Sequence, residues 1–376
     1  MTPRSRRRRR LVLAVAATAS VALAGCSTIQ NNRQNSLEPK GSASNTINNL
    51  FWPIGIVAAL IGVLVLGGVV YCAIRFRYRP GKNENPKQVH GSTKLEIGWT
   101  LVPALILAAV AVPTVSTIFK LNENPGPAAL QVKVVGKQWW WQFDYKDANI
   151  VTADELVIPT KRDVHVSLTA CDATLPGGCN VIHSFWVPEL TGKRDVVPGH
   201  DNSLTFSADK PGTYLGQCAE YCGLSHANMR FRVIAMSPDD FDTWVNEQQQ
   251  ASVEPLVDSS NQPAGAAQQL ITKFGCTNCH IFDDSSKASL GPNLTHLGSR
   301  STFASGTYKL NESNLVSWLL DAPSLIPMQS KDCRLPPGPN VTCVGMPSFT
   351  KNTPKGDPVM TRDEAQQIAE FLLSQK

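Results

Sequence analysis

The segment Gly216-Gln217-Cys218-Ala219-Glu220-Tyr221-Cys222-Gly223-Leu224-Ser225-His226-Ala227-Asn228-Met229 gathers two thiols, an imidazole, a thioether and a carboxylate, in the order C-x-E-x-C-x-x-x-H-x-x-M. Thiolate, imidazole and a weak thioether together favour copper. Zinc usually takes Cys, His or carboxylate ligands and leaves a thioether out. The alternative is a structural disulfide between Cys218 and Cys222. A gap of three residues is short for such a bridge, and the disulfide leaves the other donors unexplained.

A second segment supplies the further ligand that this loop needs, because the loop contains only one imidazole. His183 stands in Val181-Ile182-His183-Ser184-Phe185-Trp186, between β-branched and aromatic residues that indicate a strand. A lone histidine in a strand is usually an ordinary hydrogen-bonded residue. Two matching segments instead predict that His183 is a ligand.

The segments 183–190 and 218–229 resemble subunit II of the haem-copper cytochrome c oxidases, where this motif holds the dinuclear copper A centre. The resemblance implies two bridging thiolates, one imidazole per copper, a weak thioether and a backbone carbonyl, which are in turn Cys218 and Cys222, His183 and His226, Met229, and Glu220. It also implies that the Glu220 side chain faces a magnesium or manganese ion at the interface with subunit I. The chain departs from the family at Asn180, where Asp is common.

The net charge of +5 arises from the N-terminus, since Arg4 and Arg6 to Arg10 lie in a first segment without acids. Without these six arginines the formal charge is −1, so the composition does not indicate a nucleic-acid surface. The basic start and the apolar run 11–24 predict an export signal over residues 1–25. Leu23-Ala24-Gly25-Cys26 resembles a bacterial lipoprotein cleavage site and predicts that Cys26 is lipidated. A plain signal peptide and an uncleaved anchor are the alternatives.

Four of the ten cysteines flank short loops that contain Pro and Gly, and an exported compartment permits disulfides. We expect two bridges, Cys171 with Cys179 and Cys333 with Cys343. Free thiols, or pairing between the two loops, are the alternatives.

Two apolar runs, 51–74 and 97–119, are long enough to span a bilayer. After a tether at 26–48, they predict a transmembrane hairpin over residues 49–120. Arginines and lysines at 75–94 favour a cytoplasmic loop, with both ends of the hairpin outside. A pair of buried core helices is the alternative.

Glu96 opens the second run, where the helix dipole stabilises a carboxylate. The segment also resembles the subunit II motif whose Glu sits at the mouth of a proton channel in subunit I. An ionisable group at a membrane edge suits that role.

From Leu130 onward the pattern changes to short alternating runs broken by Gly, Pro and Asp. Such runs are typical of a β-sandwich or barrel. We therefore expect a Greek-key, cupredoxin-like domain over residues 128–236. The copper loop would join its last strands, and His183 would come from a neighbouring one.

Trp139, Trp140 and Trp141 are consecutive, and successive side chains of a strand point to opposite faces. A packed core therefore explains only the inward ones. The segment resembles the family's aromatic patch, whose first Trp passes electrons from cytochrome c to copper, and Trp139 matches that position. An exposed amphipathic ring suits such a recognition surface. A membrane-interface aromatic is the alternative.

After a linker at 237–264, Cys276-Thr277-Asn278-Cys279-His280 forms C-x-x-C-H, the attachment signal for c-type haem. Two thioethers fix the porphyrin and His280 binds iron, whereas a zinc or redox motif is the alternative. The order of helical segments resembles small class I cytochromes c, so we expect an all-α cytochrome c domain over residues 265–376. Met346, which precedes Pro347, is the expected second axial ligand, and Met328 is its rival.

The sequence thus predicts a multidomain chain with a two-helix transmembrane hairpin, an all-β cupredoxin-like sandwich and an all-α class I cytochrome c domain. The fused form resembles the caa-type cytochrome c oxidases. That resemblance implies electron transfer from cytochrome c or another membrane donor, through haem c, Trp139 and copper A, to subunit I for oxygen reduction coupled to proton transport. Subunit III is a further expected partner, and the outer face of a bacterial cytoplasmic membrane the expected location.

Three other functions remain open. A quinol oxidase subunit II shares the hairpin and sandwich but needs neither Cys218 and Cys222 nor C-x-x-C-H. A nitric oxide reductase with a copper A subunit could use nearly the same chain. A membrane-tethered electron carrier without an oxidase partner is the third. Oxygen chemistry itself is not expected on this chain, because it lacks the several intramembrane histidines needed to ligate haem and copper.

Overall fold

The structure is a computed structural model that describes residues 33–79, 81, 88, 90–170, 181–251, 255–258, 260–282, 290–328, 345–350 and 359–376. The predicted lipid site and the predicted disulfides lie outside the described residues, at Cys26, Cys171, Cys179, Cys333 and Cys343. The chain divides into two compact units, Asn45–Glu123 and the remainder. Each unit is described by itself.

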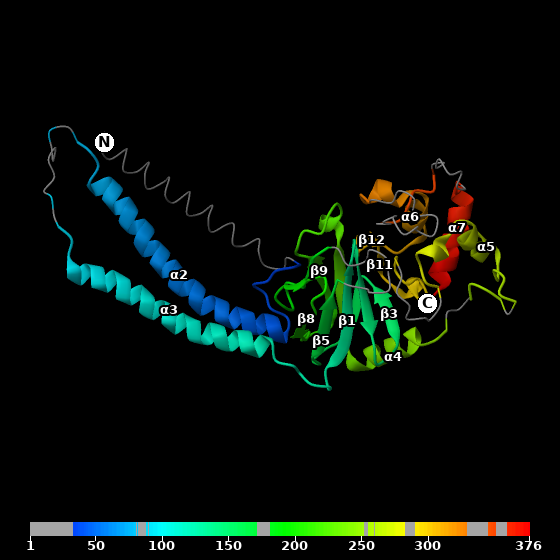
Figure 1. The fold of residues 1–376 in the computed structure, drawn as a ribbon, viewed down its shortest axis with the longest axis horizontal. Helices are drawn as coiled ribbons and strands as arrows, with labels where there is room; N and C mark the ends of the chain where they lie inside the picture. The colour runs from blue at the N-terminus through cyan, green and yellow to red at the C-terminus, as the bar shows by residue number, and fades with distance from the viewer. Residues whose placement is uncertain are drawn as a thin grey trace, which may run out of the picture. The chain divides into compact units, whose positions relative to one another are not determined.

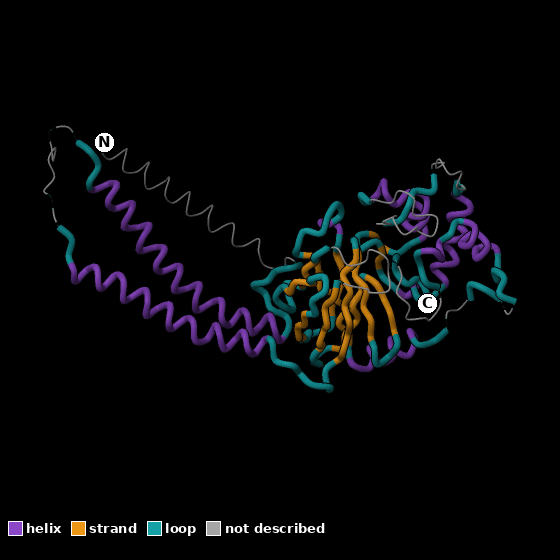
Figure 2. Tube along the Cα trace, in the orientation of Figure 1, coloured by secondary structure: helices purple, strands orange, loops and turns teal. Residues whose placement is uncertain are grey.

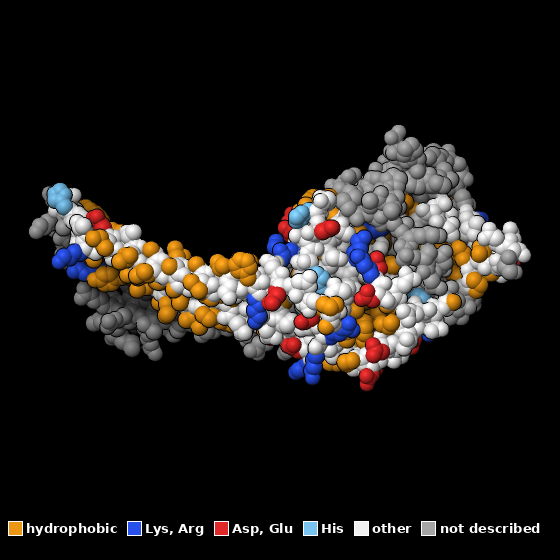
Figure 3. Space-filling view, turned by 60° about the horizontal axis from the view of Figure 1, so that its bottom comes forward, with side chains coloured by type: hydrophobic (Ala, Val, Ile, Leu, Met, Phe, Trp, Pro, Cys, Tyr) orange, Lys and Arg blue, Asp and Glu red, His pale blue; other side chains and the backbone are white. Residues whose placement is uncertain are grey.

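The first unit is built from two long apolar helices, α2 (Ser42–Arg75) and α3 (Thr93–Leu121). Both are long enough and apolar enough, by length and composition, to cross a membrane. Their large side chains are mostly exposed, and Figure 3 shows these hydrophobic residues covering the helices. Helix α2 begins earlier than the apolar run predicts, so residues 42–48 of the expected tether are helical. Residues 42–44 of α2 belong to the second unit, in which Ser44 Oγ donates to the Glu189 carbonyl at 2.8 Å.

The second unit contains a sandwich of two five-stranded sheets within the described residues (Figure 2). One sheet has the order β3-β2-β1-β5-β8 and the other the order β4-β10-β9-β6-β7. Strands β1 and β5 pair in parallel, as do β10 and β4, and the other pairs are antiparallel. The strands of the first sheet are β1 (Leu130–Lys137), β2 (Trp140–Tyr145), β3 (Ile150–Ala153), β5 (Val164–Thr169) and β8 (Asn202–Phe206). Those of the second are β4 (Glu155–Pro159), β6 (His183–Trp186), β7 (Arg194–Val196), β9 (Gly212–Cys218) and β10 (Arg230–Met236).

The sandwich core is aromatic. Trp141 and Phe143 point inward from β2 and are fully buried. They pack on Phe231, with ring centroids 5.4 and 5.9 Å away, and Phe231 stacks on Phe185 at 4.6 Å. Aromatic rings bury the largest apolar area per residue, so this cluster fixes the spacing of the two sheets. Because β6, β9 and β10 all contribute to it or pair beside it, the cluster also fixes the strands that carry the predicted copper ligands.

The described part of the C-terminal region, residues 265–376, is mainly helical, and the expected all-α cytochrome c domain stays a prediction. Its helices are α5 (Ala266–Lys273), α6 (Glu312–Leu325) and α7 (Arg362–Ser374), and α4 (Pro238–Gln248) precedes the region and contacts β4. A short hairpin interrupts them, formed by β11 (Thr302–Phe303) and β12 (Tyr308–Lys309) (Figure 1). Three positive backbone φ values in a row, at Ala304, Ser305 and Gly306, turn the chain between these strands. The sequence pattern does not predict such a turn, because only Gly306 of the three is a residue type that commonly has a positive φ.

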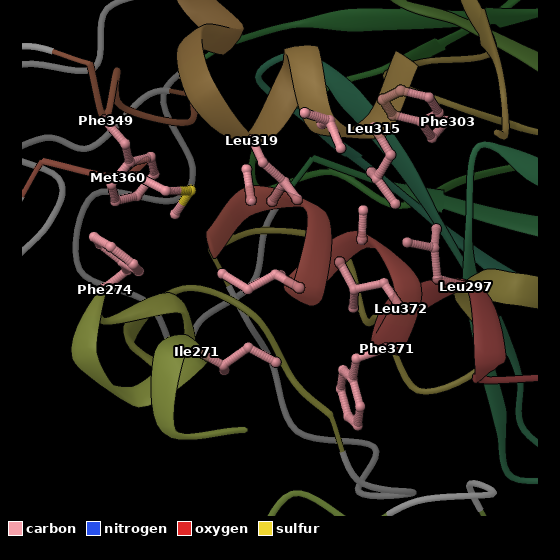
Figure 4. Close-up of a cluster of buried hydrophobic side chains, with 14 of the residues drawn as sticks. Ile271, Phe274, Leu297, Phe303, Leu315, Leu319, Phe349, Met360, Phe371 and Leu372 are labelled. Atoms are coloured by element: carbon pink, nitrogen blue, oxygen red, sulfur yellow. The ribbon is translucent and has the colours of Figure 1, made fainter. Parts of the chain in front are cut away.

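A separate hydrophobic core holds the C-terminal region together. Helix α7 contributes Ile368, Phe371 and Leu372 to one buried cluster with Ile271 of α5 and Leu319 of α6. Figure 4 shows this cluster around α7. A capping box fixes the start of α7: the Thr361 hydroxyl accepts from the Glu364 amide, and the Glu364 side chain accepts from the Thr361 amide. The sandwich and the C-terminal region therefore have distinct cores within one compact unit.

Candidate metal centre

The predicted copper loop connects the end of β9 with the start of β10. Strand β9 ends at Cys218, and a single 3₁₀ turn at His226–Asn228 precedes Arg230. Strand β6 pairs with β9, with Phe185 opposite Cys218. This pairing brings His183, two residues before Phe185, to the loop although the two lie far apart in the sequence. The register of one sheet therefore assembles the site.

All the predicted donors converge. The Sγ atoms of Cys218 and Cys222 lie 3.9 Å apart. The Nδ1 atom of His183 is 3.9 Å from Cys218 Sγ, and the Nδ1 atom of His226 is 3.5 Å from Cys222 Sγ. Met229 Sδ is 3.7 Å from Cys222 Sγ, and the Glu220 carbonyl is 3.2 Å from Cys218 Sγ. The donor atoms of His183, Cys218 and Cys222 fall within 4.8 Å of one another.

This arrangement excludes the disulfide alternative and fits a pair of soft metal ions. A disulfide requires an S–S distance near ~2.05 Å, whereas the two Sγ atoms are 3.9 Å apart. The His183 imidazole lies beside the Cys218 thiol and the His226 imidazole beside the Cys222 thiol. The donor set therefore contains one imidazole for each of two metal ions, with both thiols between them. Thiolate and imidazole with a distant thioether is a copper-type donor set.

The environment favours a thiolate at the first cysteine. The pKa of the Cys218 thiol is lowered, because its thiolate accepts hydrogen bonds from Cys222 and His183 and lies near the Glu220 and Ser184 backbones. The pKa of Cys222 is raised, because its ionisation would place a second negative charge beside the first in a buried place. The two thiols therefore share one proton, and a positive metal pair is the group that would permit both to ionise.

Glycines allow the close approach of strands around the site. A Cβ atom added at Gly136 of β1 would lie 2.9 Å from Cδ2 of His183. One added at Gly216 of β9 would lie 2.2 Å from the Phe231 ring. Both distances are shorter than normal van der Waals contact, so the absence of a side chain at these positions lets His183 and Phe231 take their places.

Trp139 lies against the copper loop, but it is not an exposed ring. Its indole Nε1 donates to the Cys222 carbonyl at 3.0 Å, and Gln138 Nε2 donates to the same oxygen at 2.8 Å. Only 8% of Trp139 is exposed, and 7% of Trp140. The expectation of an exposed recognition ring is therefore wrong for the described structure, because the Trp139 ring lies against the copper loop and both rings border the cavity that the C-terminal region lines. Trp140 Nε1, for example, donates to the Leu290 carbonyl at 3.3 Å.

The C-x-x-C-H motif lines a cavity of about 180 Å³. Its wall combines Cys276, Cys279 and His280 with Trp139 of the sandwich. His280 Nδ1 lies 2.8 Å from the Pro292 carbonyl, and with the proton on Nδ1 it donates there and leaves Nε2 for a metal. Burial lowers the pKa of His280, which favours the neutral ligand form. A Cβ atom at Gly291 would approach the His280 ring to 2.6 Å, so this position needs glycine.

Both methionine candidates reach this cavity. Met346 and Met328 line its wall, and the Met346 amide donates to Met328 Sδ at 3.2 Å. The structure therefore brings both thioethers to the cavity that His280 lines, and the preference for Met346 stays a prediction. The described residues thus supply the thiols, the imidazole and a thioether that covalent haem c requires.

Two kinds of sequence similarity to known proteins, to family models and to individual relatives, agree with this geometry. Residues 154–236 match the family model of the cytochrome C oxidase subunit II periplasmic domain, and residues 28–117 match that of its transmembrane domain. The cytochrome c oxidase subunit 2 of Alkalihalophilus pseudofirmus is 38% identical over 309 residues, which cover 81% of this chain and 85% of that protein.

This chain belongs to the cytochrome c oxidase subunit II family. As such it is a subunit of an oxidoreductase complex. The subunit 2 of Bacillus subtilis is 34% identical over 276 residues, covering 68% of this chain and 74% of that protein. A quinol oxidase subunit 2 of Bacillus cereus is 32% identical over 235 residues, covering 60% and 77%. The periplasmic domain of subunit II of Bradyrhizobium japonicum cytochrome oxidase covers 32% of this chain and 94% of its own length, at 30% identity and a TM-score of 0.29.

Two further predicted site residues, Glu96 and Glu220, differ in how far their side chains are exposed. Glu96 lies in the first turn of α3 with its side chain exposed, where the helix dipole favours a carboxylate. Glu220 turns its carbonyl toward Cys218 while its side chain is partly buried. The structure describes a single chain, so the proposed proton channel and the interfacial magnesium or manganese site stay predictions.

Sequence reasoning missed several residues around the site. Gln138 holds the Cys222 carbonyl, and Ser225 donates from Oγ to the Pro327 carbonyl, next to Met328. Asp154 and Glu155 are buried, and both bond to the C-terminal region. Two adjacent acids leading into the apolar run 156–158 were the one available signal.

Proposed function

We propose that this subunit II carries a dinuclear copper A centre and a covalently attached haem c, and passes electrons from an external donor to oxidase subunit I. One observation carries the proposal: six donor groups from two distant segments converge in the pattern that copper A needs. The copper pair would supply reversible one-electron transfer with little change of geometry. Cys218 and Cys222 would hold it through their thiolates and His183 and His226 through imidazole nitrogens, with Met229 and the Glu220 carbonyl as weaker donors.

The chain's own residues set the electron route. Trp139 borders the cavity that His280 lines and bonds through Nε1 to the Cys222 carbonyl. Its ring therefore lies between the two proposed centres. His280 and Met346 would ligate the haem iron, with Cys276 and Cys279 forming the thioether links. Two adjacent polar contacts, from Gln138 and Trp139 to one carbonyl, keep this face of the copper loop fixed.

Several further assignments belong to the same proposal. The partners are subunits I and III, and cytochrome c or another membrane donor. The chain lies in the bacterial cytoplasmic membrane through α2 and α3, with its redox centres on the outer face and Cys26 lipidated. Glu220 faces a magnesium or manganese ion at the subunit I interface, and Glu96 marks the entrance of a proton channel. The disulfides would join Cys171 with Cys179 and Cys333 with Cys343.

The quinol oxidase alternative is disfavoured by the same geometry. A subunit that serves quinol needs no converging thiols, whereas the thiols of Cys218 and Cys222 each have an imidazole beside them. The other two alternatives differ from the proposal in the partner subunit. An oxidase needs a subunit I that reduces oxygen, a nitric oxide reductase needs one that reduces nitric oxide, and a simple electron carrier needs neither.

The test is metal and haem analysis of the full-length chain purified in its complex, with copper offered during growth. We expect two coppers with a mixed-valence EPR signal and a near-infrared band, and one covalent haem. Cys222→Ser abolishes the copper signal and keeps the haem. Cys72→Ser is the matched control, because Cys72 is an exposed free cysteine in α2. Zinc or no metal at the Cys218 site, with the haem intact, would reduce the chain to a tethered cytochrome.

A further inference from the structure

The chain turns between β3 and β4 at a corner made of two buried carboxylates. Asp154 has a positive φ of 60° and is 4% exposed, and Glu155, also 4% exposed, opens β4. Asp154 Oδ1 accepts from the Trp141 amide at 2.9 Å, which ties the corner to β2. Buried carboxylates are costly unless they are hydrogen-bonded or paired with charge. The hydrogen-bond partners of Asp154 and Glu155 therefore indicate the role of these two carboxylates.

Most of those partners belong to the C-terminal region. Glu155 Oε1 accepts from the Thr302 amide at 2.9 Å and from the Thr302 hydroxyl at 2.6 Å. The amide and hydroxyl of Ser301 also donate to the Glu155 carboxylate. Asp154 Oδ2 accepts from the Ser305 amide at 3.0 Å. Arg300 supplies positive charge to both carboxylates. The corner therefore binds one short segment, residues 300–305.

That segment has a backbone conformation that needs outside support. Ala304, Ser305 and Gly306 all have positive φ, at 51°, 56° and 67°. Side chains disfavour this region, and such residues persist where the surroundings hold them. Asp154 holds Ser305, and Arg232 of β10 donates from Nη2 to the Gly306 carbonyl at 3.2 Å. The sandwich thus fixes the turn from two sides.

The same turn reaches the proposed electron route. Ser305 Oγ donates to the Trp139 carbonyl at 2.6 Å, and the Trp139 indole donates to the Cys222 carbonyl at 3.0 Å. One continuous series of contacts therefore runs from Asp154 through Ser305 and Trp139 to the copper loop. Asp154, Ser305 and Trp139 also line the cavity that His280 and Met346 border.

We propose that Asp154 and Glu155 form a clamp that keeps the C-terminal domain docked and holds Trp139 between the two redox centres. Domains joined by a linker are expected to move relative to each other unless their interface is extensive. Here the buried hydrogen bonds fix one register, so haem c is a fixed donor that need not diffuse to Trp139. The clamp residues are positioning residues, and their role in electron transfer rests on the proposed function.

The test uses the purified oxidase complex carrying variants of this chain. A photo-excited ruthenium complex reduces haem c, and the visible and near-infrared bands follow electron arrival at copper. The rate is measured at several viscosities, set with glycerol. Diffusive docking slows with viscosity, whereas transfer within a docked pair does not. The variants are Glu155→Gln, which removes the clamp charge, and Ser305→Ala, which removes the bond to Trp139. Ser317→Ala is the matched control, since Ser317 is exposed on α6 and bonds within that helix.

We expect a viscosity-independent rate in the wild type and in Ser317→Ala. Glu155→Gln should be slower and viscosity-dependent, on the order of tenfold, because a misplaced reacting group costs at least that much. Ser305→Ala should be slower but viscosity-independent. The haem potential and the copper EPR signal should stay unchanged in all variants, which a general folding defect would not permit.

A viscosity-dependent wild type, or a Glu155→Gln variant without viscosity dependence, overturns the clamp. If Glu155→Gln fails to assemble, Ser301→Ala removes a clamp bond from the opposite side and the same criterion applies. A wild-type complex without copper or haem would instead remove the proposed function, and the clamp's role in electron transfer with it. The two failures are therefore distinguishable.

Discussion

Individual side chains in this subunit II gain their chemistry from neighbours that the chain brings from elsewhere. Cys218 is an ordinary thiol by sequence, yet Cys222, His183 and the Glu220 carbonyl surround its sulfur. Asp154 is an ordinary acid by sequence, yet burial raises its pKa to about 7 despite hydrogen bonds from the Trp141 and Ser305 amides. Cys222 and Glu220 belong to the same loop as Cys218, whereas His183 comes from β6. Tertiary placement supplies His183 to Cys218, and it supplies the burial and the Ser305 amide that act on Asp154.

The raised pKa of Asp154 predicts a pH dependence of stability. Its pKa rises from 3.8 to about 7 on folding, so between these values the folded state binds more protons than the unfolded state. Stability from this residue is therefore complete below about pH 4 and is lost as pH rises through 7, by at most about 4 kcal/mol. In Asp154→Asn this slope should disappear. Denaturation midpoints of both proteins from pH 4 to 8 measure it, and parallel curves would contradict the prediction.

The two methionines in the cavity can be separated by their effect on haem. Because a thioether axial ligand raises the haem potential, Met346→Ala should lower it by on the order of 100 mV or more, within the ~0.8 V range that axial ligands span. Met328→Ala, a matched change in the same cavity, should leave the potential nearly unchanged. Redox titration of haem c in both variants is the measurement. The reverse result would assign Met328 as the ligand.

At the scale of elements, strand pairing builds the metal centre. Strand β6 brings His183 beside Cys218, and β1 crosses beneath it at Gly136. A register slip of one residue would send every side chain of β6 to the opposite face. The aromatic stack of Phe185 and Phe231 prevents such a slip, because both rings are buried between the sheets.

The Gly136 contact gives a prediction at this scale. In Gly136→Ala, the new Cβ atom would lie 2.9 Å from His183 Cδ2, so the imidazole must shift. Overpacking of this kind costs roughly 1–3 kcal/mol, and the displaced ligand should change the copper EPR hyperfine pattern while haem spectra stay normal. Gly62→Ala in α2, where an added Cβ meets nothing within 4 Å, is the control. An unchanged copper signal in Gly136→Ala would mean that His183 does not bind copper.

At the scale of the whole chain, the sandwich and the C-terminal region each have a hydrophobic core, and polar contacts join the two regions. The aromatic core of the sandwich and the core around α7 have no residues in common. The hydrogen bonds between the two regions include those of Asp154, Glu155, Trp139, Trp140, Ser225 and Arg232. With separate cores, each of the two proposed redox centres can form without the other, and the polar contacts would set how the two sites face each other.

This separation predicts the result of removing the haem. The double variant Cys276→Ala with Cys279→Ala should lack covalent haem, and the C-terminal region should become more susceptible to proteolysis because its cavity loses its filling. The copper EPR signal should remain, since none of its ligands lies in that region. Loss of the copper signal in this variant would show that the sandwich depends on the haem domain to fold.

The motifs that carry the chemistry can be predicted from the amino-acid sequence, because fixed spacing of Cys, His and Met within a few residues is a local property. The two apolar helices, the alternating strands and the family resemblance can be predicted in the same way. The folded structure was needed to show that His183 meets Cys218, that Trp139 is buried, and that the C-terminal region contains a hairpin. It alone showed that Asp154 and Glu155 face residues 301–305. These are contacts between segments far apart in the chain, and local patterns cannot specify them, because burial and pairing depend on how the two sheets and the C-terminal core pack.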